Sequence, residues 1–138
     1  MNDQQDLTDR IEALPPVRQL VNSMDMRARK SLGQNFLFDL NLTRRIARSA
    51  GTLSGTTIEV GSGPGGLTRA LLLEGATHLI AIEKDHRATG VLSELTSAAD
   101  GRLRVIEADA MKIAIWDMGS TPRRIIANLP YNIATKLL

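Results

Sequence analysis

The chain has 138 residues, no cysteine, and 17 lysines and arginines against 15 aspartates and glutamates. This length allows one domain at most, and 43% hydrophobic with 23% charged residues is a globular composition, which argues against disorder. No apolar run approaches the roughly 18 residues of a membrane span, and the acidic residues at the start of the chain exclude a secretory signal. The absence of cysteine fits a reducing, cytoplasmic location.

Residues 1–26 are predicted as a helical extension with a net charge of −3. One helix is expected over Leu7–Leu14, ended by Pro15–Pro16, and a second over about residues 16–25. Residues 27–48 carry six basic residues against one acidic residue. Such a block can contact phosphates or can simply form the solvated face of a helix.

Residues 27–138 are predicted as an α/β domain. Asp39 is placed to cap a helix that runs to Ala50, with Leu42, Ile46 and Ala50 on its apolar face and Gly51 as its stop. Strands are expected at 57–60, 78–83, 103–107 and 124–127, with helices after the first two strands and a further helix starting at Ile133. Because parallel strands need crossovers of this length, the alternation predicts a parallel sheet.

The carboxyl ends of the four predicted strands carry the least core-like residues of the domain. These are Gly61–Gly66, Glu83, Asp109 and Asn128–Tyr131. In a parallel α/β sheet the carboxyl ends meet at one edge, where ligands bind. The sequence therefore predicts a binding site at that edge.

Gly61, Gly63 and Gly66 match a glycine fingerprint between a strand and a helix. Glu83 ends the next strand, where a carboxylate can accept hydrogen bonds from ribose hydroxyls. The same stretch reads Glu59-x-Gly61-x-Gly63-x-Gly65, a spacing seen in methyltransferases. A nicotinamide dinucleotide and S-adenosylmethionine both fit these residues.

Two further strand ends favour a methyltransferase that acts on an adenine amine. The Asp109 carboxylate can accept a hydrogen bond from the exocyclic amine of the adenine in a cofactor. The side-chain oxygen of Asn128 and the carbonyl of Leu129 can draw out the lone pair of a target amine, Pro130 stiffens the loop, and Tyr131 can stack on the base. No metal is expected, since a sulfonium is already activated, and no role is assigned to His78 or His86.

Five motifs together resemble the ribosomal RNA adenine dimethyltransferases of the small-subunit methyltransferase A type. The resemblance covers about residues 27–138 and rests on Lys30–Leu37, Glu59–Thr68, Ile82–Asp85, Asp109–Ala110 and Asn128–Thr135. Ser62 stands where proline is common in the family, a change expected to be tolerated. The resemblance implies a Rossmann-like fold and transfer of two methyl groups from S-adenosylmethionine to N6 of each of two adjacent adenosines.

The resemblance also implies roles for individual residues. The cofactor would be contacted by Asn35, Leu37, Gly61, Gly63, Glu83, Asp109 and Asn128. The target adenine would be held by Asn128, Leu129, Pro130 and Tyr131, and RNA phosphates by Arg27, Arg29 and Lys30. The implied partner is small-subunit rRNA within a ribosomal subunit precursor, bound by a monomer.

Other functions remain open on the sequence alone. The runner-up is the related large-subunit rRNA adenine methyltransferase, followed by a DNA adenine methyltransferase and a non-catalytic RNA-binding module. A nicotinamide oxidoreductase is disfavoured because no residue supplies an acid or base for hydride transfer. The final helix pattern stops without a cap, so an incomplete domain, lacking the last strands and a helical C-terminal domain and inactive by itself, is expected.

Overall fold

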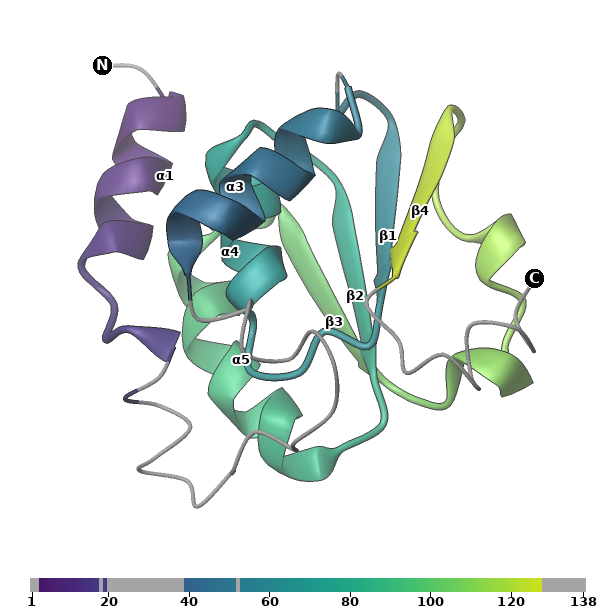
Figure 1. The fold of residues 1–138 in the computed structure, drawn as a ribbon. Coiled ribbons are helices and arrows are strands. Elements are labelled where there is room, and N and C mark those ends of the chain that lie inside the picture. The colour runs from purple at the N-terminus through teal and green to yellow at the C-terminus, as the bar shows by residue number, and fades with distance from the viewer. Residues whose placement is uncertain (1–2, 18, 20–38, 52, 128–138) are drawn as a thin grey trace.

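A parallel sheet lies at the centre of the molecule, with helices on one face (Figure 1). The computed structural model describes residues 3–17, 19, 39–51 and 53–127. The predictions for residues 20–38 and 128–138, among them the helix expected from Ile133, concern residues outside this range.

Four strands form the sheet in the order β3-β2-β1-β4. Their bounds are β1 Thr56–Val60, β2 Leu79–Glu83, β3 Leu103–Glu107 and β4 Arg123–Ala127. All neighbours pair in parallel, with Val60 opposite both Ile82 and Ala127, and Glu83 opposite Glu107. The predicted parallel sheet is confirmed, each strand within one residue, and the four carboxyl ends lie at one edge.

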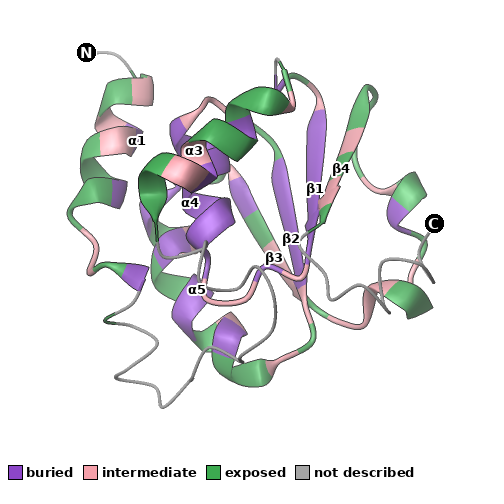
Figure 2. Ribbon diagram, in the orientation of Figure 1, coloured by how far each residue is buried: buried purple, intermediate pink, exposed green. Residues whose placement is uncertain are grey.

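Four described helices cover one face of the sheet (Figure 1). They are α1 Asp3–Glu12, α3 Leu40–Ser49, α4 Gly66–Leu73 and α5 His86–Ala98. Every residue of α4 is buried, because this helix lies between the sheet and helices α1 and α3 (Figure 2). The larger hydrophobic core lies between these helices and the sheet, and includes Leu71, Leu72 and Leu92.

The opposite face of the sheet is covered by a shorter crossover. Between β3 and β4 the chain forms two 3-10 turns, η2 Ala110–Lys112 and η3 Ile115–Asp117. Ile115 packs with Ile58 and Ile82 of the sheet in a second, smaller core. Trp116 and Ile125 remain exposed on this side of the structure.

Helix α3 has the predicted N-terminal cap but a partly different buried face. Asp39 caps α3 as predicted, its carboxylate accepting from the amide of Leu42 at 3.2 Å. The predicted apolar face is only partly correct: Leu42 is half-buried and Ala50 packs against the core, but Ile46 is 41% exposed, and the fully buried residues are Thr43 and Ala47. The small side chains of Thr43 and Ala47 let α3 pack closely on α4, and the Thr43 hydroxyl is directed at the carbonyls of its own first turn.

The first helix begins at Asp3 rather than at Leu7. Its two buried apolar residues, Leu7 and Ile11, are one turn apart, and polar contacts extend the helix toward its start. The Gln4 amide donates to the carbonyls of Leu72 and Leu73 at the end of α4. The start of the helix is therefore set by contacts with α4. The hydrophobic pattern of residues 7–14 cannot reveal these contacts.

Candidate functional site at the carboxyl edge of the sheet

The glycine-rich loop connects β1 to α4 and is fixed at its start by β2. The amide of Gly61 donates to the carbonyl of Ile82 at 2.9 Å. Gly65 caps α4 with φ +98°, and a Cβ there would lie 2.9 Å from a methyl carbon of Leu92, so both conformation and space require glycine. At Gly63, with φ +53°, no described atom lies within 4 Å of where a Cβ would be, which leaves room for a ligand to approach.

Glu83 is held in place by the loop and by its own turn. One carboxylate oxygen accepts from the amide of Gly63 at 3.0 Å, and the other from the amide of Asp85 at 3.1 Å. Each carboxylate oxygen has a second lone pair, so Glu83 can still accept from the hydroxyls of a ribose. The amide of Gly63, in contrast, already donates to Glu83 and is not available to a ligand. Gly63 instead contributes open space, because it has no side chain.

Asp109 follows β3 at the same edge and is half-buried. Its Oδ1 accepts from the amide of Met111 at 2.9 Å, which caps the turn at Ala110–Lys112. No described residue donates to Oδ2, so this oxygen is available to an amine. Gly61, Gly63, Glu83 and Asp109 are thus brought together along one edge, on three adjacent strands.

The remaining predicted site residues lie outside the described part of the chain. They are the cofactor residues Asn35 and Leu37, the basic residues Arg27, Arg29 and Lys30, and the loop Asn128, Leu129, Pro130 and Tyr131. Their roles remain predictions.

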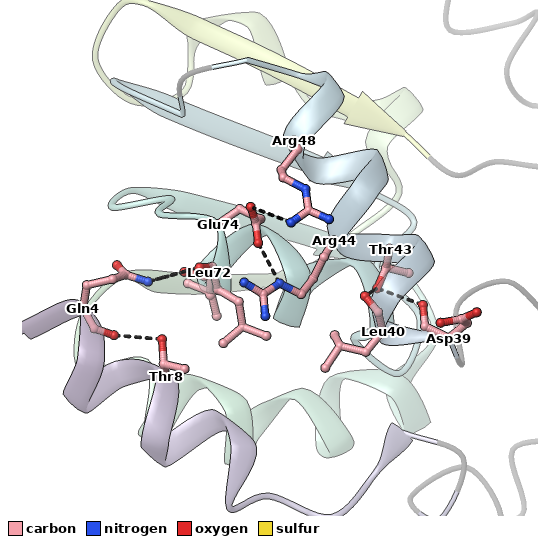
Figure 3. A network of polar contacts seen from close by, with 10 residues as sticks. Gln4, Thr8, Asp39, Leu40, Thr43, Arg44, Arg48, Leu72 and Glu74 are labelled. Atoms are coloured by element: carbon pink, nitrogen blue, oxygen red, sulfur yellow. Dashed lines mark hydrogen bonds and ion pairs between the residues drawn. The ribbon is translucent and has the colours of Figure 1, made fainter.

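The basic block of residues 27–48 is partly used within the fold. Arg44 pairs with Glu74 at 2.6 Å, and Arg48 approaches the same carboxylate at 3.8 Å (Figure 3). Glu74 follows α4, so these contacts join α3 to the end of that helix. Of the three arginines on α3, only Arg45 has no ion pair with a described residue, and it is exposed.

Glu59 is a buried acid close to the site, and sequence reasoning gave it no role beyond a motif spacing. It lies on β1 with 1% of its surface exposed, and burial raises the pKa of its carboxyl to about 8. A hydrogen bond from the Thr68 hydroxyl, at 2.5 Å, opposes this shift, and the negative charge of Glu83 adds to it. At neutral pH the Glu59 carboxyl is therefore protonated.

The described residues hold neither a cluster of metal ligands nor a membrane-spanning helix. No group of three or more histidines, cysteines, aspartates or glutamates there is arranged to hold a metal ion. Within the same ranges, none of the helices combines the length and apolarity needed to cross a bilayer.

Comparison with known proteins identifies the family. The model of a family described as ribosomal RNA adenine dimethylase matches residues 25–138. The chain belongs to this family. Within the rRNA adenine dimethylases, it is 58% identical over 128 residues to a ribosomal RNA small subunit methyltransferase A from Rhodospirillum rubrum, covering 92% of this chain and 44% of that protein.

Solved structures agree with this assignment. A 23S rRNA methyltransferase, ErmE, superposes with a TM-score of 0.60 at 27% identity, over 75% of this chain and 41% of that one. A dimethyladenosine transferase from Plasmodium falciparum superposes with a TM-score of 0.52 at 29% identity, over 68% and 34% of the two chains. The chain spans about half the length, 44–46%, of the curated relatives it matches.

Proposed function

We propose that this chain carries the S-adenosylmethionine site of an enzyme that dimethylates N6 of two adjacent adenosines in small-subunit rRNA. The observation that carries this proposal is the pair of carboxylates at neighbouring strand ends, Glu83 and Asp109, beside the open space over Gly63. The spacing suits a cofactor with a ribose and an adenine. The bound cofactor supplies an activated methyl group.

The residues of this chain would bind and orient the two reactants. Glu83 accepts from the ribose hydroxyls, and Oδ2 of Asp109 accepts from the adenine amine of the cofactor. Asn128 and the Leu129 carbonyl accept from the target amine, so that its lone pair faces the methyl group, while Tyr131 stacks on the flipped base. Each transfer forms a bond from N6 to the methyl carbon, breaks the carbon–sulfur bond, and releases one proton from N6.

The small subunit is favoured over the large subunit as the source of the substrate. The small-subunit methyltransferases match at 54–58% identity, whereas the 23S rRNA methyltransferase structure matches at 27%. The proposed partner is therefore small-subunit rRNA in a ribosomal subunit precursor, bound by a monomer. Arg27, Arg29 and Lys30 would contact its phosphates, so binding should weaken as salt rises.

Calorimetry with S-adenosylhomocysteine tests the cofactor site. Glu83→Ala should weaken binding at least tenfold, because both ribose hydroxyls lose their acceptor. Glu107→Ala is the matched control: it removes an exposed carboxylate from the adjacent strand end, where Glu107 contacts only His86 and Thr89 among the described residues, and should change affinity less than twofold. Unchanged affinity in folded Glu83→Ala would remove Glu83 from the ribose role.

Methyl transfer tests the reaction itself. In the full-length protein, Asn128→Ala should largely abolish transfer of labelled methyl groups to undermethylated small subunits. A near-wild-type rate would contradict the proposed role in holding the amine. A non-catalytic RNA-binding module would show no transfer in the wild-type protein either.

A further inference from the structure

A buried hydrogen bond closes the base of the glycine-rich loop. Glu59 lies on β1 two residues before Gly61, and Thr68 lies in the first turn of α4 two residues after Gly66. The Thr68 hydroxyl donates to Glu59 Oε1 at 2.5 Å, and both side chains are at most 1% exposed. The bond thus joins the strand that enters the loop to the helix that leaves it.

The bond from Thr68 is the strongest polar contact of Glu59, and the Ser62 side chain of the loop also acts on its carboxyl. Its register partners on the flanking strands are Ala81 and Ile126, which are apolar. Arg69 follows Thr68 on α4, but the charge that acts on it is Glu94 of α5. A buried carboxyl with one strong hydrogen bond is costly unless that bond is kept, so the pair resists separation.

Besides the bond from the Gly61 amide to the Ile82 carbonyl, two side-chain contacts hold the loop. Glu83 fixes the middle of the loop by accepting from the amide of Gly63. The Glu59–Thr68 bond joins the strand before the loop to the helix after it. Because Glu83 takes part in both the loop contact and the proposed ribose contact, the position of the loop affects how Glu83 is presented to a ligand.

We propose that Glu59 is a positioning residue for the cofactor site: through Thr68 it fixes the first turn of α4, and so holds the Gly61–Gly66 loop in its binding conformation before any ligand arrives. The proposal rests on the proposed function only for the identity of the ligand. Glu59 itself touches no ligand in this account. Its neutral carboxyl acts as a hydrogen-bond acceptor, so a glutamine should replace it.

Hydrogen exchange of the loop amides in the ligand-free chain tests the ordering role directly. Thr68→Val keeps the shape of the side chain but removes the donor, and should speed exchange of the Gly63 amide at least tenfold and weaken S-adenosylhomocysteine at least fivefold. Thr43→Val is the control, because Thr43 is equally buried on α3 and bonds only to carbonyls of its own helix. It should change both quantities less than twofold.

Conservative variants separate positioning from general destabilisation. Thr68→Ser and Glu59→Gln retain the donor and the acceptor, so both should keep slow exchange and near-wild-type affinity, whereas Glu59→Ala should behave like Thr68→Val. Unchanged Gly63 exchange in Thr68→Val, or loss in Glu59→Gln equal to that in Glu59→Ala, would overturn the proposal. If exchange responds as expected but the wild-type chain binds no cofactor, the proposed function fails while the positioning role stands.

Discussion

The two ends of helix α4 are stabilised in opposite ways. At its C-terminal end, side chains from other helices bond to the last carbonyls of the helix and to the acidic residue that follows it. Gln4 of α1 donates to the carbonyls of Leu72 and Leu73, and Arg44 of α3 pairs with Glu74 (Figure 3). At its N-terminal end, Gly65 has no side chain to cap the helix, and the loop is held from below by Glu59 and from the side by Glu83.

This difference indicates a division of roles along one helix. The C-terminal end is closed by contacts within the protein, so changes there should affect stability alone. The outer side of the N-terminal loop is left open for a ligand, so changes there should affect both stability and cofactor binding. Variants at the two ends of α4 should separate these roles.

The largest effect is expected from the protonation of Glu59. Its pKa is raised from 4.5 to about 8 in the folded chain, so between these values the unfolded state has lost a proton that the folded state retains. The free energy of unfolding should therefore fall as pH rises through this window, by about 5 kcal/mol. Urea unfolding of wild type and Glu59→Gln across this range checks it, and parallel curves for the two proteins would be evidence against a shifted Glu59.

A pair of glycine substitutions compares the two ends directly. Gly65→Ala forces a positive φ and a 2.9 Å contact with Leu92, and should cost about 2 kcal/mol and at least tenfold in cofactor affinity. Gly75→Ala, beyond the other end, also has a positive φ but meets no described atom within 4 Å, and should cost about 1 kcal/mol with unchanged affinity. Urea unfolding and calorimetry measure the two effects, and an affinity loss in Gly75→Ala would contradict the division.

Loss of the contact that α1 makes with α4 is expected to have a smaller effect on stability. Gln4→Ala removes the donor to Leu72 and Leu73 and the acceptor for Arg102, at 2.7 Å, and should cost about 1 kcal/mol. Thermal unfolding measures this loss. Cofactor affinity should stay at the wild-type value, and a fall in affinity would show that α1 influences the binding loop.

The smallest effect is expected at Glu74. Glu74→Gln weakens the ion pair with Arg44, whose side chain is 34% exposed and therefore screened by solvent, so the cost should be about 0.5 kcal/mol. The difference in melting temperature from wild type should shrink as salt is added. A difference that is independent of salt would mean that hydrogen bonding, rather than charge, holds α3 to α4.

The order of the elements could be predicted from sequence because the signals are local. Asp39 and Asp85 each cap the helix that follows, and both accept from an amide of the first turn. The strands are short β-branched or apolar runs, and their carboxyl ends collect Gly61, Glu83 and Asp109 as expected. For these residues, chain order and parallel topology are sufficient to place them.

The features that could not be predicted depend on packing between distant segments. The buried face of α3 is set by the close approach of α4, which favours Thr43 and Ala47 over larger apolar residues. The burial of Glu59 depends on the fit of α4 against β1. His86 was assigned no role because no carboxylate lies near it at a useful spacing, yet its Nδ1 lies 2.8 Å from Glu107, 21 residues away.

The contacts of α1 bear on the order in which the molecule folds. The residues that anchor this helix lie much later in the chain: Leu72, Leu73 and Arg102 bond to Gln4, and Ala98 bonds to Arg10. Leu7 and Ile11 cannot be buried until α4 and α5 have formed the surface on which they pack. Contacts of such long sequence separation slow folding. Helix α1 can therefore dock only after α4 and α5 have formed, and its apolar face stays exposed until then.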